Sequence, residues 1–358
     1  MKTHYFDGIE SRGHEAVLFC HDRDSGLKAL IAFHDTTLGP AAGGTRRWAY
    51  ASEAQALEDV LRLSQGMTLK CSAAGLDYGG GKIVILSEPG APPSRQQYLA
   101  LGRFIDRFQG HYVTGEDVGT GDRELGWISE TTRWVVGLPA EGMDKPETSA
   151  QTALGVRLGM EACLRRLRGR RDLQGVTVAV QGLGHVGMKL AHALAQRGAR
   201  LVVSDLDSAK VEQAVSRWQA QAVEPEDIYS KQCDVFSPCA LGGTINRQTV
   251  NRLRCKVVAG SANNQLDDDS DAELLFRREI VYAPDFVVNA GGAIDNLAML
   301  DPAGYNAGRV EEQIRQIPNR IERILDISDQ QSLSTQDAAL QMARERLDAA
   351  RRARGEPS

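Results

Sequence analysis

The chain has 358 residues, of which 42% are hydrophobic and 25% charged, and its formal net charge is −5. This is the profile of a soluble globular protein with room for two domains and a sizeable core. The negative charge argues against a nucleic-acid partner, and no apolar run approaches the ~20 residues of a membrane span. We therefore expect neither a nucleic acid nor a membrane as a partner.

The six cysteines are scattered along the chain, with neither a CxxC pair nor the spacing of a zinc site. We expect no metal site, and free thiols are typical of a reducing cytoplasm. Residues 1–15 lack the apolar stretch of a secretory signal. Both observations favour a cytoplasmic protein.

The N-terminal third is predicted to mix strands and helices. Two short apolar runs, residues 15–22 and 27–35, flank the turn sequence RDSG and predict a β-hairpin. Residues 52–75 are predicted to form an amphipathic helix with Ser52 as its N-cap, and residues 94–110 a second helix.

Between these helices, three glycines at 79–81 precede Lys82 and an apolar strand at residues 83–86. Glycine costs conformational entropy on folding, so three in a row indicate a sharp bend or the close approach of another group. The alternative is a glycine hairpin that carries an ordinary solvated lysine.

The second half of the chain has a different pattern. Residues 137–151 are rich in glycine and proline and predict a linker, and a long helix at 152–167 follows. Strands and helices then alternate, which predicts a parallel sheet with crossover helices. The basic cluster at 165–172 is interpreted as a solvated helix end, and the tail at 310–353 as helical.

One stretch carries a dinucleotide-binding pattern in its full context. A strand at residues 176–180 leads into Gly182-x-Gly184-x-x-Gly187, and a helix and a second strand ending at Asp205 follow. The glycines permit a tight turn, close approach of the pyrophosphate and close helix packing, and the helix N-terminus attracts phosphate. Asp205 would accept the ribose hydroxyls and repel a 2′-phosphate, which favours NAD over NADP. The alternative for Asp205 is a helix N-cap.

A nicotinamide enzyme that makes or breaks an amine needs a group to manage the proton. A lysine serves this purpose at neutral pH when its pKa is depressed or when it pairs with a carboxylate. Lys82 and Lys70 are the candidates, and Asp117 is a candidate carboxylate. Alternatively, Lys70 is a surface cation at a helix end, and Asp117 caps a turn.

Eight stretches in order resemble one family over residues 15–350: HDTTLGPAAGGTRRW, ALEDVLRLSQGMTLK, DYGGGKIVI, TGEDVGT, VAVQGLGHVG, FSPCALGG, AGSANNQL and APDFVVNAGG. The resemblance is to the glutamate/leucine/phenylalanine/valine amino-acid dehydrogenases. It implies an α/β fold with a cleft between two domains. Residues 1–140, joined by a C-terminal helix at about 330–358, would form a substrate-binding and oligomerisation domain with a mixed sheet. Residues 150–330 would form a Rossmann domain that binds NAD.

The resemblance also implies a reaction and a set of site residues. The reaction is the reversible oxidative deamination of an L-amino acid to a 2-oxo acid and ammonia, with Lys82 as acid/base and Asp117 holding the substrate nitrogen. Lys70 would bind the substrate carboxylate. The other expected substrate-binding residues are Ala42, Gly43, Gly44, Met67, Gly115, Asn263, Ala293 and Asn296. The expected cofactor-binding residues are Gly182, Leu183, Gly184, His185, Val186, Gly187, Asp205, Ala240, Asn263 and Asn289. Of the adjacent Asn263 and Asn264, one is expected to be structural.

The chain departs from the aliphatic members of this family at three positions. Ala42, Gly115 and Ala293 stand where those members tend to have Leu, Ala and Val, and all three changes remove side-chain volume. Because empty apolar volume is costly, the differences favour a bulky hydrophobic or aromatic substrate. Asp295 and Asn296 are a further departure, and Asn296 either bonds a polar group of the substrate or faces away.

Two alternatives remain at this point: a leucine- or valine-type enzyme whose pocket is filled in another way, and a non-catalytic NAD-binding protein that keeps the fold. The resemblance further implies a homo-oligomer, a dimer or an octamer. The sequence leaves open the exact amino acid and the direction of the reaction.

Overall fold

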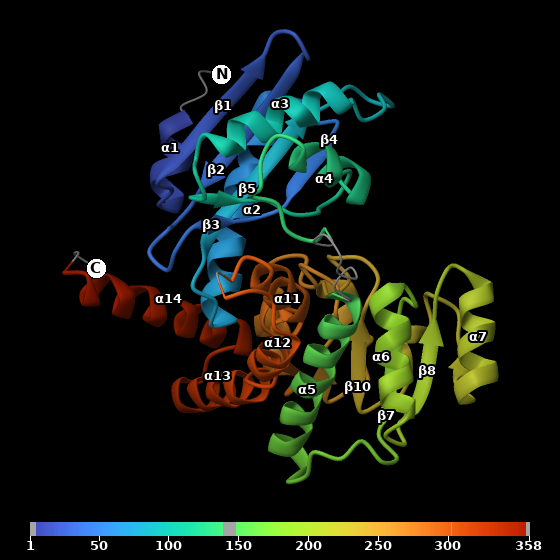
Figure 1. Cartoon of the computed structure of the whole chain (residues 1–358). Coiled ribbons are helices and arrows are strands. Elements are labelled where there is room, and N and C mark those ends of the chain that lie inside the picture. The colour runs from blue at the N-terminus through green and yellow to red at the C-terminus, as the bar shows by residue number, and fades with distance from the viewer. Residues whose placement is uncertain (1–4, 139–147, 302, 356–358) are drawn as a thin grey trace. The chain divides into compact units, whose positions relative to one another are not determined.

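The computed structural model describes residues 5–138, 148–301 and 303–355, and it divides the chain into two compact units. Unit 1 comprises residues 1–146 and 343–358, and unit 2 comprises residues 147–342. The last helix, α14 (Thr335–Ala353), contributes its first residues to unit 2 and its last residues to unit 1 (Figure 1).

Unit 1 is built on a mixed sheet. Its elements are, in chain order, α1 (Tyr5–Arg12), β1 (Ala16–Asp22), β2 (Leu27–Phe33), β3 (Ala41–Ala42), β4 (Thr45–Trp48), α2 (Glu53–Ala73), β5 (Gly79–Leu86), α3 (Arg95–Asp106), β6 (Tyr112–Val113) and α4 (Asp122–Ser129). The strand order is β1-β2-β5-β3-β6, with β4 paired to β5; β1, β2 and β5 are antiparallel neighbours and the other pairs are parallel. The mixed sheet and the β1–β2 hairpin were predicted and are confirmed.

Alternation along the strands assigns the two faces of this sheet. Ile83 and Ile85 of β5 pack in the cluster that contains α3 and α4, whereas Val84 packs with α2. Because successive strand residues point to opposite faces, Lys82 lies on the same face as Val84, beneath α2. The position of the lysine relative to the helix is therefore set by the strand's period of two.

Unit 2 is built on a parallel sheet. Its elements are α5 (Thr148–Arg168), β7 (Thr177–Gln181), α6 (His185–Ala195), β8 (Arg200–Ser204), α7 (Ser208–Trp218), β9 (Gln221–Ala222), η1 (Ile228–Ser230), β10 (Val235–Pro238), α8 (Arg247–Val250), β11 (Val257–Val258), α9 (Asp271–Arg277), β12 (Val281–Tyr282), α10 (Asp285–Val288), α11 (Gly291–Ala298), α12 (Ala307–Ile314), α13 (Ile317–Gln331) and the start of α14. The strand order is β12-β11-β10-β7-β8-β9, and every pair is parallel.

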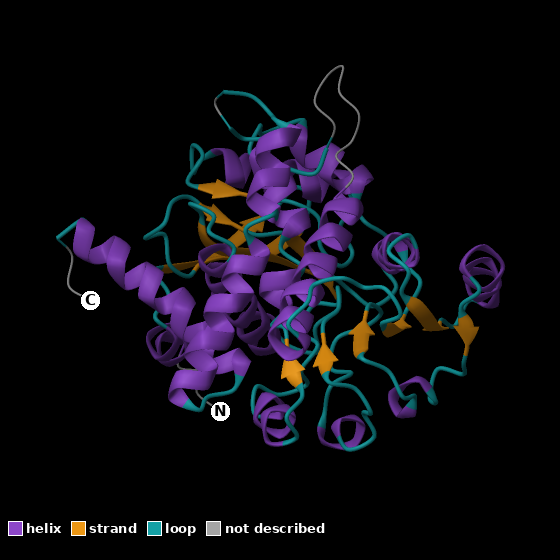
Figure 2. Cartoon of the chain, turned by 90° about the horizontal axis from the view of Figure 1, so that it is seen from below, coloured by secondary structure: helices purple, strands orange, loops and turns teal. Residues whose placement is uncertain are grey.

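If β7 to β12 are renumbered 1 to 6 in chain order, the strands run 3-2-1-4-5-6 from β9 to β12. This is the strand order of dinucleotide-binding folds. Figure 2 shows helices on both sides of this row of strands. The predicted parallel sheet is confirmed. The chain order reverses between β7 and β10, and ligands of such sheets bind at the carboxyl ends of the strands next to that point.

Several local predictions need correction or refinement. The glycines at 79–81 lie inside strand β5, so the alternative of a glycine hairpin was wrong. The helix predicted to follow the glycine motif begins at His185, inside the motif. Part of the predicted linker, residues 139–147, lies outside the described residues, and its last four residues already belong to α5. The predicted helical tail is divided into α12, α13 and α14.

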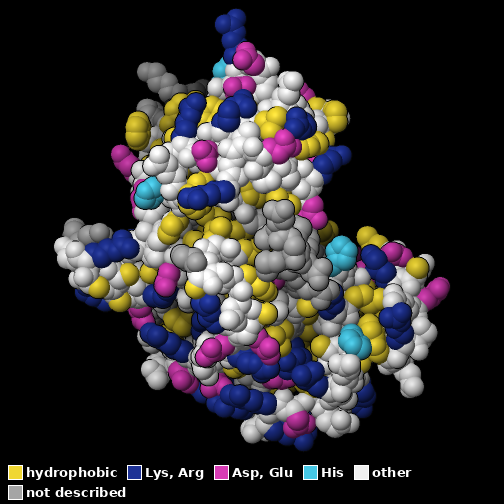
Figure 3. Space-filling model, viewed as in Figure 1, with side chains coloured by type: hydrophobic (Ala, Val, Ile, Leu, Met, Phe, Trp, Pro, Cys, Tyr) yellow, Lys and Arg dark blue, Asp and Glu magenta, His cyan; other side chains and the backbone are white. Residues whose placement is uncertain are grey.

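The basic cluster at the end of α5 is paired with acidic residues of α13. Arg165 and Arg171 both contact Glu322, and Arg166 contacts Asp326 and Asp329. On the face seen in Figure 3, dark-blue and magenta side chains lie among one another. Within the described part of the chain, no helix is long and apolar enough to cross a membrane.

Candidate active site

The centre of the candidate site in unit 1 is a buried ion pair. Lys82 Nζ, in the middle of β5, lies 3.1 Å from Asp117 Oδ2, in the loop after β6. Lys82 is 5% exposed, while the side chain of Asp117 is 21% exposed. The structure thus brings together the two residues that the sequence predicted as catalytic.

Burial is the main influence on the pKa of Lys82. It lowers the pKa of Lys82 below that of a free amine, against the opposing effect of Asp117. Burial alone would raise the pKa of Asp117, but the positive charges of Lys82 and Arg46 hold it below its usual range. The pair therefore combines an ionised carboxylate with an amine that gives up its proton more readily than usual.

The loop that carries Asp117 is held by its backbone. Residues 117 and 120 exchange N–H···O=C hydrogen bonds, which closes a tight turn. The carbonyl oxygens of Gly115 and Val118 accept hydrogen bonds from the N–H groups of Thr45 and Arg47 on β4. A Cβ at Gly44 would lie 2.3 Å from Glu116 O, so only glycine lets the loop come this close.

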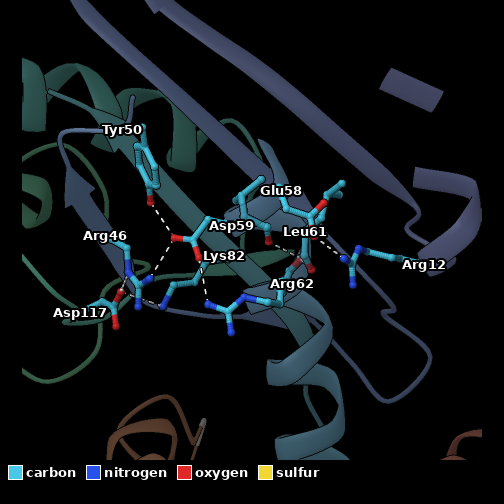
Figure 4. A network of polar contacts seen from close by, with 11 residues as sticks. Arg12, Arg46, Tyr50, Glu58, Asp59, Leu61, Arg62, Lys82 and Asp117 are labelled. Atoms are coloured by element: carbon cyan, nitrogen blue, oxygen red, sulfur yellow. Dashed lines mark hydrogen bonds and ion pairs between the residues drawn. The ribbon is translucent and has the colours of Figure 1, made fainter. Parts of the chain in front are cut away.

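Sequence reasoning missed two residues of this site, Arg46 and Asp59. The Arg46 guanidinium donates from Nε to Asp117 Oδ2 at 2.8 Å and from Nη1 to Asp59 Oδ2 at 2.9 Å. Figure 4 shows both carboxylates turned toward Arg46, with Lys82 beside Asp117. The available signal was the first arginine in GGTRRW, two positions after the glycines already assigned to the site.

The three glycines at 79–81 are explained by packing. A Cβ at Gly80 would lie 2.1 Å from Thr68 Oγ1 and 2.3 Å from Ser64 O, both on α2. One at Gly81 would lie 2.5 Å from the Tyr112 ring. The close approach that the sequence predicted is therefore made, at these positions, by the protein's own helix and ring.

The remaining predicted residues of unit 1 lie around this pair. Gly43 lies against β5, where an added Cβ would be 1.7 Å from Gly81 O, and Ala42 is a buried residue of β3. Met67 and Lys70 are partly buried on α2, eight and eleven positions after Asp59, and such spacing places them on the same side of the helix.

Gly115 is buried, and a Cβ there would lie 3.2 Å from Val136 Cγ2. Val136 therefore already borders the space that a side chain at position 115 would enter.

In unit 2, the glycine motif forms the turn between β7 and α6. Gly182 has a positive φ of 94°, and a Cβ there would lie 2.7 Å from Ala240 Cβ, beyond the end of β10. Gly187 packs against the Gly182 carbonyl, where a Cβ would lie 2.1 Å away. At Gly184 a Cβ would have no neighbour within 4 Å. Two of the glycines are thus needed for packing, and the third leaves the backbone accessible.

The residues around Gly184 present the start of α6 to solvent. His185 is the first residue of α6 and is exposed, Val186 is partly buried, and Leu183 is buried. Ala240, at the adjacent strand end, is exposed. An accessible helix N-terminus at the reversal point of the sheet suits a dinucleotide's pyrophosphate, so these residues fit the cofactor that the sequence predicts.

Asp205 at the end of β8 is bonded to the backbone. Its Oδ2 accepts a hydrogen bond from Leu183 N at 2.6 Å, and its Oδ1 accepts one from Asp207 N at 2.9 Å. The helix that follows is capped by Asp207, whose side chain accepts from Ala209 N, so the N-cap alternative for Asp205 was wrong. Asp205 ties the glycine turn to the second strand, and each of its oxygens keeps a further lone pair.

The predicted asparagines of unit 2 meet one another. Asn289 Nδ2 donates to Asn263 Oδ1 at 2.9 Å, and Asn289 is 4% exposed. Asn264 has a φ of 51°, so it is the turn residue of the adjacent pair. Asn289 Oδ1 is buried and has no partner among the described residues, so it is placed to accept a hydrogen bond from a ligand such as a carboxamide.

The last predicted residues lie on α11. Ala293 and Asn296 are partly buried, and Asn296 Oδ1 is buried without a partner in the described part of the chain. Asp295 is fully buried, accepts a hydrogen bond from Tyr305 Oη at 2.8 Å, and burial raises its pKa. Across residues 5–138, 148–301 and 303–355, no group of three His, Cys, Asp or Glu is placed to hold a metal ion.

Comparisons with known proteins agree with this architecture. Residues 14–134 match the family described as Glu/Leu/Phe/Val dehydrogenase, dimerisation domain, and residues 145–211 and 205–355 match Glutamate/Leucine/Phenylalanine/Valine dehydrogenase. Over 349 residues the chain is 46% identical to leucine dehydrogenase of Geobacillus stearothermophilus. The alignment covers 98% of this chain and 95% of that protein.

Two further relatives have other substrates in their names. The chain is 42% identical over 344 residues to phenylalanine dehydrogenase of Thermoactinomyces intermedius, covering 96% of this chain and 93% of that protein. The crystal structure of L-tryptophan dehydrogenase from Nostoc punctiforme matches with a TM-score of 0.88 at 39% identity, over 97% of this chain and 99% of that one. Relatives of similar identity thus differ in the amino acid they are named for.

Proposed function

We infer the reaction from one premise: the chain belongs to the glutamate/leucine/phenylalanine/valine dehydrogenase family and is an amino-acid dehydrogenase. We propose that it catalyses the reversible, NAD-dependent oxidative deamination of a bulky hydrophobic or aromatic L-amino acid. The buried ion pair between Lys82 and Asp117 is the observation that carries the chemistry, because it supplies a proton acceptor and an anion side by side.

The overall reaction converts an L-amino acid, water and NAD⁺ into a 2-oxo acid, an ammonium ion, NADH and a proton. Bound NAD⁺ supplies the hydride acceptor. Lys82, whose pKa burial lowers, accepts a proton from the attacking water and returns one to the departing nitrogen. Asp117, which stays ionised, holds that nitrogen. Lys70 binds the substrate carboxylate, bordered by Gly43 and Gly44.

For the cofactor, we assign the pyrophosphate to the turn at Gly184 and the start of α6. The ribose hydroxyls are assigned to Asp205, whose oxygens keep lone pairs beside the bonds to Leu183 N and Asp207 N. The negative charge of this carboxylate would repel a 2′-phosphate, so NAD is favoured over NADP. Asn263 and Asn289 are assigned to the nicotinamide side, which the unpartnered Asn289 Oδ1 supports.

The size of the substrate is the finer part of the proposal. Ala42, Gly115 and Ala293 stand where the aliphatic members of the family tend to have larger residues, and a larger substrate would fill the volume they leave. The partnerless oxygen of Asn296 supports a substrate with a polar donor on its ring, such as an indole N–H.

A leucine- or valine-type enzyme is the second candidate, and two observations favour it. Val136 borders the space at Gly115, so less room is left there than the missing side chain suggests. The identity of 46% to a leucine dehydrogenase is also slightly above that to the phenylalanine enzyme.

We further propose that unit 1 joins copies of the chain into a homo-oligomer. The match of residues 14–134 to a dimerisation domain supports this. Its outer strand β1 and helix α1 expose Phe19 and Phe6, which are 58% and 73% accessible, and exposed aromatic side chains are typical of contact surfaces. Light scattering coupled to gel filtration tests this: a monomeric mass contradicts it.

One experiment tests the reaction, the substrate and the cofactor together. Purified enzyme is given each of the L-amino acids with NAD⁺ or NADP⁺, and formation of the reduced cofactor is followed by absorbance. We expect turnover of phenylalanine or tryptophan with NAD⁺. Preference for leucine or valine selects the second candidate, and equal use of NADP⁺ contradicts the role of Asp205. No turnover of any amino acid contradicts the proposed reaction.

A further inference from the structure

Arg46 occupies a position for which neither the motifs nor the proposed mechanism gives a role. It lies on β4 opposite Val84 of β5, and partners in a sheet point to the same face. Lys82, two residues before Val84, lies on that face as well. Strand geometry therefore brings the guanidinium and the amine to the same side of the sheet, beneath α2.

The guanidinium is fixed between two carboxylates. Nε donates to Asp117 Oδ2 and Nη1 donates to Asp59 Oδ2, and the side chain of Arg46 is 20% exposed. Asp59, on α2, also accepts from Tyr50 Oη at 2.8 Å and from Arg62 Nη2 at 3.1 Å. Because Asp59 is held by three donors, it forms a firm outer anchor for Arg46 (Figure 4).

This arrangement sets the orientation of Asp117. Its Oδ2 receives both Lys82 Nζ and Arg46 Nε, whereas its Oδ1 takes part in no hydrogen bond or ion pair among the described residues. With both cations on one oxygen, the carboxylate cannot rotate without losing a charge-assisted bond. The other oxygen is left free to accept a hydrogen bond from a substrate nitrogen.

The same contacts set the charge around Lys82. Arg46 faces it from β4, Asp59 from α2 and Asp117 from the loop after β6; Lys70 lies further along α2. Burial, the largest influence, lowers the pKa of Lys82; Arg46 lowers it too, while Asp117 and Asp59 raise it. The nearby phenols of Tyr50 and Tyr112 add no charge, because burial raises the pKa of both.

We propose that Arg46 is a positioning residue for the deamination: it turns the free oxygen of Asp117 toward the substrate nitrogen and, together with Asp59, balances the charge around Lys82. This inference rests on the proposed function and deepens it. A purely structural role for Arg46 would not predict opposite effects of Arg46 and Asp59 on the pKa of Lys82, whereas this proposal does.

The test compares the pH dependence of kcat/KM in four variants. One limb of the kcat/KM–pH profile follows the ionisation of Lys82. In Arg46→Gln a positive charge is lost, so the pKa of Lys82 should rise and this limb should move up by about one pH unit. In Asp59→Asn a negative charge is lost, and the same limb should move down. Arg46→Lys keeps the charge, so its limb should stay near that of wild type. A lysine lacks the forked guanidinium that reaches the two carboxylates from separate nitrogens, so its kcat/KM should fall by about tenfold or more.

Tyr50→Phe is the matched control, because it removes a hydrogen bond to Asp59 without removing a charge; its limb should stay in place. A thermal melt of each variant checks folding. If Arg46→Gln does not fold, a downward movement in Asp59→Asn beside an unmoved limb in Arg46→Lys still tests the charge balance, and an unmoved limb in Asp59→Asn overturns it. Limbs that do not move, or that move in the same direction for Arg46→Gln and Asp59→Asn, overturn the inference.

A second readout is independent of catalysis. The rate at which acetic anhydride labels Lys82 is measured against pH by peptide mass spectrometry, and its midpoint should move in the same opposite directions. If the midpoints move as expected but wild type oxidises no amino acid, the proposed function falls and the charge balance stands. If amino acids are oxidised and the midpoints do not move, the function stands and the inference is wrong.

Discussion

The two units present their candidate sites in different ways. In unit 1 the proposed chemistry depends on charged side chains, Lys82, Asp117 and Arg46, that the fold holds in one arrangement. In unit 2 the proposed cofactor recognition depends on the backbone, at the start of α6 and at Gly184, and the acidic side chain of Asp205 bonds to that backbone. A proton-transfer site needs tuned side chains, whereas a phosphate site needs exposed N–H groups.

Glycine illustrates the difference. In unit 1, Gly43, Gly44 and Gly80 each stand where another part of the chain lies within 2.5 Å of an added Cβ. In unit 2 this is true of Gly187, but Gly184 has only open space around it. A run of glycines therefore does not by itself indicate a ligand; an accessible glycine at the start of a helix is the more specific signal.

The largest expected effect follows from removing the amine of Lys82. Lys82→Ala should lower turnover by ~10²–10⁴-fold, the usual contribution of a general acid–base group, while NADH binding in unit 2 is unchanged. Turnover and the quenching or enhancement of NADH fluorescence on binding are measured side by side. A fall in both would show that the two sites do not work separately, and unchanged turnover would remove Lys82 from the mechanism.

The second prediction concerns acid, which should loosen unit 1 before unit 2. His14 and His34 lie edge to face in unit 1, and their Nε2 atoms lie 3.1 Å from Leu61 O and 2.9 Å from Arg12 O. Carbonyl partners require both Nε2 atoms to donate. His14 Nδ1 is buried and has no partner among the described residues, so a proton added there would have no acceptor.

Burial, with a smaller effect of His34, lowers the pKa of His14 from 6.5 to about 4. Between these values the unfolded chain binds the proton and the folded chain does not. The free energy of unfolding should therefore fall as the pH drops from about 6.5 to 4, by about 3 kcal/mol. Hydrogen exchange of α2 peptides should speed up in this interval, and that of α6 peptides should not.

His14→Gln should flatten this pH dependence even if it lowers stability at neutral pH, whereas His111→Gln, at an exposed site, should leave it unchanged. Equal acceleration of exchange in α2 and α6 would show that another group dominates.

The third prediction tests the two kinds of glycine. At Gly80 an added Cβ meets backbone and a short side chain of α2, so Gly80→Ala should cost at least the ~1–3 kcal/mol of an overpacked core. At Gly184, the N-cap of α6, Ala should cost less stability than at Gly80 and should weaken NADH binding, because the methyl group occupies the approach to the helix N-terminus. Urea unfolding and NADH titration of both variants check this. A larger loss of stability in Gly184→Ala than in Gly80→Ala, or none in Gly80→Ala, would contradict the assignment.

The predictions from sequence succeeded where the signal is local. The strand, glycine turn, helix and acidic residue at 176–205 are contiguous, so the parallel sheet and its motif could be predicted from a single stretch. The same holds for the β1–β2 hairpin and for Ser52 as the N-cap of α2.

The signals that failed are long-range. Whether Gly80 bends the chain or lets a helix approach depends on Ser64 and Thr68, on another element. Arg46 contacts Asp117, which lies 71 positions away in the sequence. Arg46 also contacts Asp59, but Arg46 is on a strand and Asp59 on a helix, so the spacing between them in the sequence does not predict this contact. Asp205 has a backbone partner 22 positions earlier that no helix-capping pattern indicates.

The smallest expected effect concerns the substrate, and the residues proposed to determine its size come from both units. Ala42 and Gly115 belong to unit 1 and Ala293 to unit 2. If all three border the substrate, a valine side chain would lose contacts, and each missing methylene is worth ~1–3 kcal/mol. Phenylalanine, tryptophan or a comparably bulky amino acid should then have a kcat/KM more than about tenfold above that of valine.

Refilling the volume offers the converse measurement. Gly115→Ala with Ala293→Val should move preference toward leucine, and the two single variants divide the effect between the units. The added methyl at position 115 would lie 3.2 Å from Val136 Cγ2, so part of the effect in unit 1 should come from displacement of Val136. Gly126→Ala, on α4 with no neighbour within 4 Å, is the matched control: it should leave the preference unchanged and, as a helical glycine replaced by alanine, raise stability slightly. If wild type already prefers leucine or valine to every aromatic amino acid, the volume argument fails, and Val136 becomes the first side chain to replace with a smaller one.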